Sequence, residues 1–172
     1  EKVSRVIFIP LCAGGGVKSL SDIKELLRAG ADKVSICTAA LENPSLLREA
    51  SLAFGSQSVV LSIDAGRAGQ GWHAFMKGGR IASGLEVADW ARKGIELGAG
   101  EILLNSIDRD GTKEGYDLEL LRTISDKVSV PVIASGGAGH LEDIYQAINT
   151  GQADAVLLAS LLHFGQLTIP EI

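Results

Sequence analysis

The chain has 172 residues, of which 46% are hydrophobic and 22% charged, with a formal net charge of −5 and a pI near 5.2. This is the composition of a globular domain with one core. No segment concentrates Lys and Arg, which disfavours a nucleic-acid-binding or membrane-binding surface. No apolar run is long enough to span a bilayer, and no signal peptide is recognisable. Cys12 and Cys37 lie in apolar, strand-like segments, which favours reduced thiols and predicts a cytoplasmic protein.

Six strand-length apolar runs alternate with amphipathic helical patterns along the chain. The predicted strands are Ile7–Cys12, Lys33–Ile36, Val59–Ile63, Glu101–Leu104, Val132–Ala134 and Ala155–Leu158. Ser19 with Asp22 predicts a capping box, and Asn43 before Pro44 predicts the start of another helix. Glycines stand where helices should end, at Gly30, Gly55, Gly98 and Gly151. The alternation predicts right-handed βαβ crossovers and a parallel sheet.

One connection is longer than the rest. The segment 67–82 contains Gln70–Met76, then Gly78-Gly79, then Arg80–Ala82, which predicts a small hairpin after the third strand. Glu1–Val6 resembles the tail of a helix that leads into the first strand. No linker or low-complexity segment divides the chain, so we expect a single domain over residues 1–172.

Two segments resemble each other at an offset of 121 residues, since 137 − 16 = 121. Ala13–Gly16 followed by Asp22 aligns with Ala134–Gly137 followed by Asp143. A period of four strand–helix units predicts a (β/α)₈ barrel made of two halves. Since only about six units are present, we expect an incomplete barrel that lacks its first two units. Its open edges predict self-association or completion by another chain. The doubly wound open sheet, the alternative fold, needs no internal duplication.

Glycine-rich loops and hydroxyl side chains follow the predicted strands, where parallel barrels carry their active sites. Gly14–Gly16 follows the first strand and Ser135–Gly137 follows the fifth; glycine lets backbone N–H groups approach an anion closely. Thr38 and Ser160 end the second and sixth strands, where each hydroxyl can reach a phosphate. A single such loop could carry glycines only because its turn is tight. The occurrence of the same pattern in both halves favours two phosphate sites.

Charged residues stand at both ends of the predicted strands. Asp64 closes the third strand, where a carboxylate can act as general acid or base or simply cap a turn. After the fourth strand, Asp110 and Gly111 can hold a turn and offer donors to a ligand. Lys33 and Glu101 begin the second and fourth strands on the opposite face, where they could be structural, ring a hole or dock a partner. The histidines show no ligand spacing, so we expect no metal site and no cofactor.

Five strings in this sequence together resemble the cyclase subunit of imidazole glycerol phosphate synthase. They are Gly30–Ile36, Phe54–Gln57, Gly98–Leu104, Ser106–Thr112 and Ile133–Gly139. The resemblance implies a ribulose-phosphate-binding (β/α)₈ barrel and a lyase of histidine biosynthesis. That family takes ammonia from a glutaminase subunit docked at the N-terminal face of the barrel. It converts a bisphosphorylated phosphoribulosyl-formimino aminoimidazole carboxamide nucleotide into imidazole glycerol phosphate and aminoimidazole carboxamide ribotide.

The resemblance also implies roles for single residues. Asp64 matches one of the family's two catalytic aspartates. Lys33 and Glu101 match two residues of the charged gate through which ammonia enters. Gly16 and Thr38 match one phosphate site. The matches to the other phosphate site are Asp110, Gly111, Gly137, Ala159 and Ser160.

The sequence departs from the family pattern in three ways. The other catalytic aspartate and two gate residues belong to the units that we expect to be absent. Cys37 stands where many members carry an Asn beside the phosphate, and a thiol is a poor donor. Since general acid–base assistance is typically worth about 10²–10⁴-fold in rate, we expect the chain alone to be severely impaired. The alternatives are the sugar isomerase of the same pathway and a non-catalytic barrel that binds phosphorylated metabolites.

Overall fold

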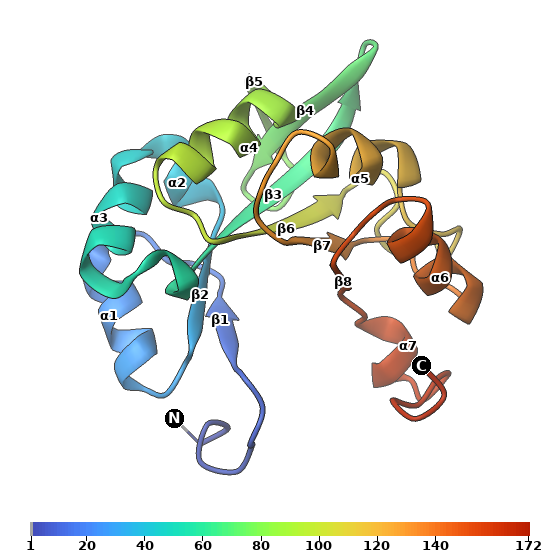
Figure 1. Ribbon diagram of the computed structural model, residues 1–172, viewed down its shortest axis with the longest axis horizontal. Helices are drawn as coiled ribbons and strands as arrows, with labels where there is room; N and C mark the ends of the chain where they lie inside the picture. The colour runs from blue at the N-terminus through green and yellow to red at the C-terminus, as the bar shows by residue number, and fades with distance from the viewer. Residues whose placement is uncertain (1) are drawn as a thin grey trace.

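A computed structural model describes residues 2–172 (Figure 1). Its strands are β1 (Cys12–Gly14), β2 (Lys33–Ile36), β3 (Val59–Ala68), β4 (Gly71–Met76), β5 (Ile81–Glu86), β6 (Glu101–Ser106), β7 (Val132–Ser135) and β8 (Ala155–Val156). Its helices are α1 (Leu20–Arg28), α2 (Thr38–Glu42), α3 (Ser45–Phe54), α4 (Val87–Glu96), α5 (Leu118–Ser125), α6 (Leu141–Asn149) and α7 (Ser160–His163), with a 3₁₀ turn, η1, at Ser56–Ser58. None of the helices within residues 2–172 is long and apolar enough to cross a membrane.

Six strands form a parallel sheet in chain order, β1-β2-β3-β6-β7-β8. A doubly wound sheet reverses its strand order, and this sheet does not, so that alternative is wrong. Figure 1 shows the strands following an arc with helices outside it, and β1 and β8 standing at its two ends. Within the described residues each of these end strands has one strand partner. The fold is an incomplete (β/α)₈ barrel.

The central strands carry the core. On β3, Val59, Val60, Leu61 and Ile63 are all at most 2% exposed, so both faces of this strand are covered. Parallel strands buried on both faces are near-continuous apolar runs, which is why the sequence marks them clearly. The outer helices complete the core through residues such as Leu47 on α3.

The first strand differs from the prediction. It spans Cys12–Gly14 and not Ile7–Cys12, because pairing with β2 begins at the Cys12–Lys33 register. Phe8 and Ile9 are 101% and 72% exposed, so their apolar character does not reflect burial in residues 2–172. The last strand, Ala155–Val156, is also shorter than predicted, and both misses lie at the ends of the sheet, where a strand has one partner. The helix predicted at Glu1–Val6 is wrong for residues 2–6, which form turns, and Glu1 lies outside the described residues.

The predicted starts of two helices had different outcomes. The capping box of α1 is confirmed: Ser19 Oγ accepts from the Asp22 N–H at 3.2 Å, and the Asp22 carboxylate accepts from the Ser19 N–H at 3.0 Å. Asn43 is wrong as a cap, because its side-chain oxygen accepts from the Ser45 hydroxyl. The predicted glycines do follow the ends of their helices.

The internal repeat is preserved in hydrogen bonds. In the first half, the Asp32 carboxylate accepts from the Leu11 N–H at 2.8 Å. In the second half, the Asp154 carboxylate accepts from the Val132 N–H, also at 2.8 Å. Each carboxylate thus joins the start of one strand to the loop before the next strand. The same contact therefore recurs at equivalent positions of the repeat, which supports the prediction of a barrel built from two similar halves.

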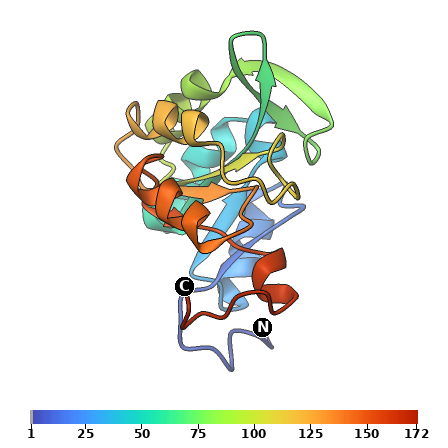
Figure 2. The same ribbon diagram turned by 90° about the vertical axis from the view of Figure 1, so that its right-hand side faces the viewer.

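The predicted hairpin is larger than the segment 67–82. Strand β3 continues through Ala68, and β4 and β5 pair antiparallel beside it, so that the projection ends at Glu86 (Figure 2). The glycines at the turn, Gly78 and Gly79, both take positive φ angles, as that turn requires. The length of the hairpin strands was underestimated because the part of β3 beyond Asp64 is less apolar than its start.

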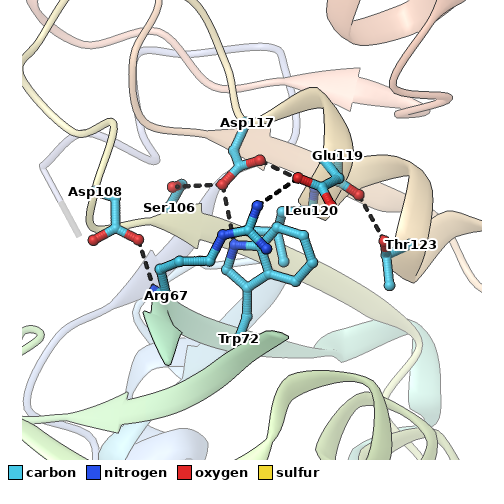
Figure 3. Close-up of polar contacts among 8 residues, drawn as sticks. All are labelled: Arg67, Trp72, Ser106, Asp108, Asp117, Glu119, Leu120 and Thr123. Atoms are coloured by element: carbon cyan, nitrogen blue, oxygen red, sulfur yellow. Dashed lines mark hydrogen bonds and ion pairs between the residues drawn. The ribbon is translucent and has the colours of Figure 1, made fainter. Parts of the chain in front are cut away.

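The root of the hairpin is fixed to α5 by one cluster of side chains (Figure 3). The Arg67 guanidinium lies 4.0 Å above the centroid of the Trp72 ring and pairs with Glu119. The Trp72 indole N–H donates to Asp117 at 3.1 Å, and the other oxygen of that carboxylate caps α5 through the Leu120 N–H at 3.0 Å. Trp72 is 5% exposed. The hairpin is therefore held rigidly at its base.

We expect Asp117→Ala to destabilise the protein by about 2–4 kcal/mol, because it removes a helix cap and leaves the buried indole N–H without an acceptor. Urea unfolding measures the change. Asp126→Ala, an exposed carboxylate at the other end of α5, is the matched control and should stay within about 0.5 kcal/mol of wild type. Equal stability of the two variants would contradict the anchoring role of Asp117.

Candidate active site

Two hollows lie at the C-terminal ends of the parallel strands. The first, of about 660 Å³, contains the predicted residues Gly16, Thr38 and Asp64, together with Cys37. The second is smaller, about 140 Å³, and lies after β6, β7 and β8. It is lined by all five residues predicted for the second phosphate site: Asp110, Gly111, Gly137, Ala159 and Ser160. The structure therefore brings together the residues predicted for each phosphate site, and it places Asp64, predicted as a catalytic residue, in the first hollow.

A third hollow, of about 490 Å³, lies outside the barrel mouth between the hairpin root and α5. Its wall contains the carboxylates of Asp108, Glu114 and Glu119 beside two arginines. It contains none of the predicted site residues, and its acidic wall disfavours a phosphate ligand.

The two glycine loops share a pair of consecutive positive φ angles. Gly15 and Gly16 take φ angles of 87° and 74°, and Gly136 and Gly137 take 90° and 105°. Side chains rarely adopt these angles, so glycine is required at all four positions. In the second loop, the Gly137 carbonyl also accepts from the Gly115 N–H at 2.8 Å, which joins the loop after β7 to the loop after β6. Each loop leads, three residues later, into a helix, α1 or α6, and a helix N-terminus suits an anion.

Asp64 lies in the first hollow within a chain of polar side chains. Its Oδ1 accepts from the Asn105 Nδ2–H at 3.1 Å, and the Asn105 oxygen accepts from the Ser135 hydroxyl at 3.0 Å. Its Oδ2 faces the Cys37 thiol, with 3.8 Å between sulfur and oxygen. These residues come from β2's end, β3, β6 and β7, so the chain of contacts crosses the barrel mouth. The sequence analysis did not identify Asn105 or the role of Ser135, since the register that brings them to Asp64 is a property of the sheet.

Burial raises the pKa of the Cys37 thiol to about 11, with the Asp64 charge as a further cause. The thiol is therefore protonated at neutral pH and can donate to Asp64. The ordinary value is 9.0, so the folded state holds this proton more tightly than the unfolded state. Its contribution to stability is complete below pH 9 and disappears as the pH rises through 11.

We expect wild type to lose more stability than Cys37→Ala between pH 8 and pH 11, because the variant lacks this thiol. The measurement is the free energy of unfolding in urea at each pH. Tyr116, whose pKa is raised to about 12 mainly by burial, is present in both proteins and cancels in the comparison. Parallel pH curves would contradict a protonated, carboxylate-bound thiol.

Lys33 and Glu101 lie at the N-terminal ends of β2 and β6, as predicted, and their side chains form an ion pair. The Cys12 thiol lies beside them; its pKa is raised by burial first and by the Glu101 charge second. Among residues 2–172, no group of three or more His, Cys, Asp or Glu side chains could hold a metal ion.

Comparison with known proteins decides the family. The family model described as "Histidine biosynthesis protein" matches residues 1–168. The chain is 54% identical over 172 residues to imidazole glycerol phosphate synthase subunit HisF of Dehalococcoides mccartyi strain 195. It belongs to the HisF family. A second relative, the HisF subunit of strain BAV1 of the same species, is 52% identical over 172 residues.

Membership of the HisF family confirms two predictions from the sequence: the resemblance to the cyclase subunit, and an enzyme of histidine biosynthesis. The match covers 100% of this chain and 68% of each of the two relatives. The 68% share of the relatives agrees with the six parallel strands seen here, whose end strands, β1 and β8, each have one strand partner within residues 2–172. The relatives are cyclase subunits, which favours cyclase chemistry over the isomerase alternative.

Proposed function

We propose that this chain closes an imidazole ring with ammonia, as the cyclase part of imidazole glycerol phosphate synthase. Its substrate would be the bisphosphorylated aminoimidazole carboxamide nucleotide, and its products imidazole glycerol phosphate and aminoimidazole carboxamide ribotide. One observation carries the proposal: two glycine-lined hollows lie at one barrel mouth, and Asp64 lies on β3 in the middle of the strand order between them. A ligand with a phosphate at each end fits this arrangement, and its middle would lie over Asp64.

Asp64 supplies proton transfer in this proposal. When ammonia adds to the substrate, the nitrogen must lose protons, and ring closure needs a proton returned to a departing group. A carboxylate within hydrogen-bond reach can perform either step, but the two protons move at separated positions, so Asp64 alone serves both poorly and the expected rate is low. Asn105 and Cys37 each direct a hydrogen at one oxygen of Asp64, so the carboxylate is held in one orientation as an acceptor.

Ammonia would enter from the opposite end of the barrel. Lys33 begins β2 and Glu101 begins β6, and their ion pair lies at the N-terminal face, away from Asp64. We propose that a glutaminase subunit docks there and that this pair belongs to the gate between the two active sites. HisF is by its name a subunit of a synthase, which supports such a partner.

The test is ammonia-dependent consumption of the bisphosphate nucleotide by this chain, with substrate binding titrated in the same samples. Binding and formation of imidazole glycerol phosphate, at a rate well below that of the HisF subunit of strain 195, are the expected results. Turnover of the aminoaldose isomer into the aminoketose, without ammonia, would instead favour the isomerase. Binding without any turnover would favour the non-catalytic barrel.

A further inference from the structure

The tip of the β4–β5 hairpin reaches the first hollow. Lys77 and Gly78 line that hollow together with Gly16, Thr38 and Asp64. The Lys77 N–H donates to the Thr38 hydroxyl oxygen at 2.9 Å, across 39 positions of sequence. The hairpin is therefore a wall of the predicted phosphate site, a role that the sequence did not indicate.

The tip is held in place from two sides. At the root, the Arg67–Trp72–Asp117 cluster joins the hairpin to α5 (Figure 3). At the turn, Gly79 lies so close to Ile107 that an added Cβ would be 3.1 Å from the Ile107 side chain. The turn thus packs on the loop after β6 and is not a free end.

Lys77 has an unfavourable backbone conformation for its residue type. Its φ angle is 55°, followed by 66° at Gly78 and 79° at Gly79. A residue with a Cβ costs about 1–2 kcal/mol in this region, and Asn or Gly would cost less. Such strain persists where the side chain or the turn is used. Within residues 2–172 the Lys77 ammonium has no hydrogen bond or ion pair, so it is available to a ligand.

The hairpin also orients the Thr38 hydroxyl. Because the Thr38 oxygen accepts from the Lys77 N–H, the hydroxyl hydrogen must point away from the hairpin backbone. The other polar wall groups of this hollow include Lys18, Glu42 and Asp64. A phosphate beside Gly16 would thus lie in a hollow that also contains the Thr38 hydroxyl and the side chains of Lys18 and Lys77.

We propose that Lys77 is a phosphate-binding residue of the first hollow, carried there by the hairpin, and that its backbone N–H sets Thr38 as a donor. This inference rests on the proposed function, since it assumes that the hollow takes a substrate phosphate. The ammonium supplies a charge-assisted hydrogen bond to the phosphate. The hairpin therefore belongs to the substrate site of this chain.

The test uses inorganic phosphate and amide NMR shifts, which report on each hollow separately. Gly16 reports on the first hollow, and Gly137 reports on the second. In Lys77→Gln we expect phosphate to bind about 3- to 10-fold more weakly at Gly16 and with unchanged affinity at Gly137. Lys77→Arg should restore the wild-type affinity. Arg80→Gln, on the same turn but outside the hollow, is the matched control and should bind as wild type does.

The outcomes separate the two proposals. Phosphate binding at Gly16 that is equal in wild type and Lys77→Gln would overturn the role of Lys77 alone. A loss that Lys77→Arg does not restore, or an equal loss in Arg80→Gln, would also overturn it, because the hairpin fold and not the charge would be responsible. Wild type without shifts at either glycine would overturn the phosphate sites of the proposed function, and Lys77 with them.

Discussion

Asp64→Asn is expected to lower the ammonia-dependent rate by about 10²–10⁴-fold while the bisphosphate substrate still binds. The carboxylate accepts two hydrogen bonds, from Asn105 and Cys37, and the amide that replaces it cannot take up the proton released by ammonia. The change is nearly isosteric, so the two phosphate hollows keep their shape. Single-turnover rates and substrate titration on the same samples measure the two effects separately.

Asp89→Asn is the matched control, because it makes the same chemical change on an exposed carboxylate of α4. It should turn over and bind as the wild type does. A rate for Asp64→Asn equal to that of the control would remove Asp64 from the chemistry. Loss of binding in Asp64→Asn would make this carboxylate a structural group of the hollow and leave the proton transfers without a residue.

The strands of this fold could be predicted inside the sheet and were misjudged at its two ends. β2 has the predicted bounds, Lys33–Ile36, because the buried Val34 and Ile36 alternate with the half-buried Lys33 and Ser35, which is the period of a strand. At the two ends of the sheet, Ile7–Pro10 and Leu157–Leu158 are as apolar as true strands but lack a partner on one side within residues 2–172. Apolar character alone does not distinguish a paired residue from an unpaired one.

The site could be predicted as far as it follows the order of the chain. Loops after parallel strands meet at one edge of a sheet, so the two glycine loops and Asp64 could be placed together without coordinates. The contacts of Asn105 and Lys77 could not. Asn105 reaches Asp64 through the register of β3 with β6, and Lys77 reaches Thr38 through the bend of the hairpin. No hydrophobic period and no motif in the sequence indicates this strand register or this bend.

The internal repeat offers a matched pair of substitutions. Gly16 and Gly137 are equivalent positions with φ angles of 74° and 105°, but their surroundings differ. An added Cβ at Gly16 would meet nothing within 4 Å, whereas at Gly137 it would lie 2.2 Å from the Gly115 carbonyl oxygen. We expect Gly16→Ala to cost about 1–2 kcal/mol of stability, from the backbone conformation alone. We expect Gly137→Ala to cost about 3–5 kcal/mol, because steric overlap is added to that strain.

Urea unfolding of both variants tests this difference, and phosphate titration tests its effect on the sites. In Gly137→Ala, the loops after β6 and β7 must separate, so phosphate binding should fall by about tenfold or more at the second hollow and stay unchanged at the first. Gly71→Ala, with an ordinary φ angle and open space around it, is the control and should change neither property by much. Equal costs at Gly16 and Gly137 would mean that the loop after β7 can move away from Gly115. The hydrogen bond between Gly115 and Gly137 would then be no part of what holds the second phosphate site in shape.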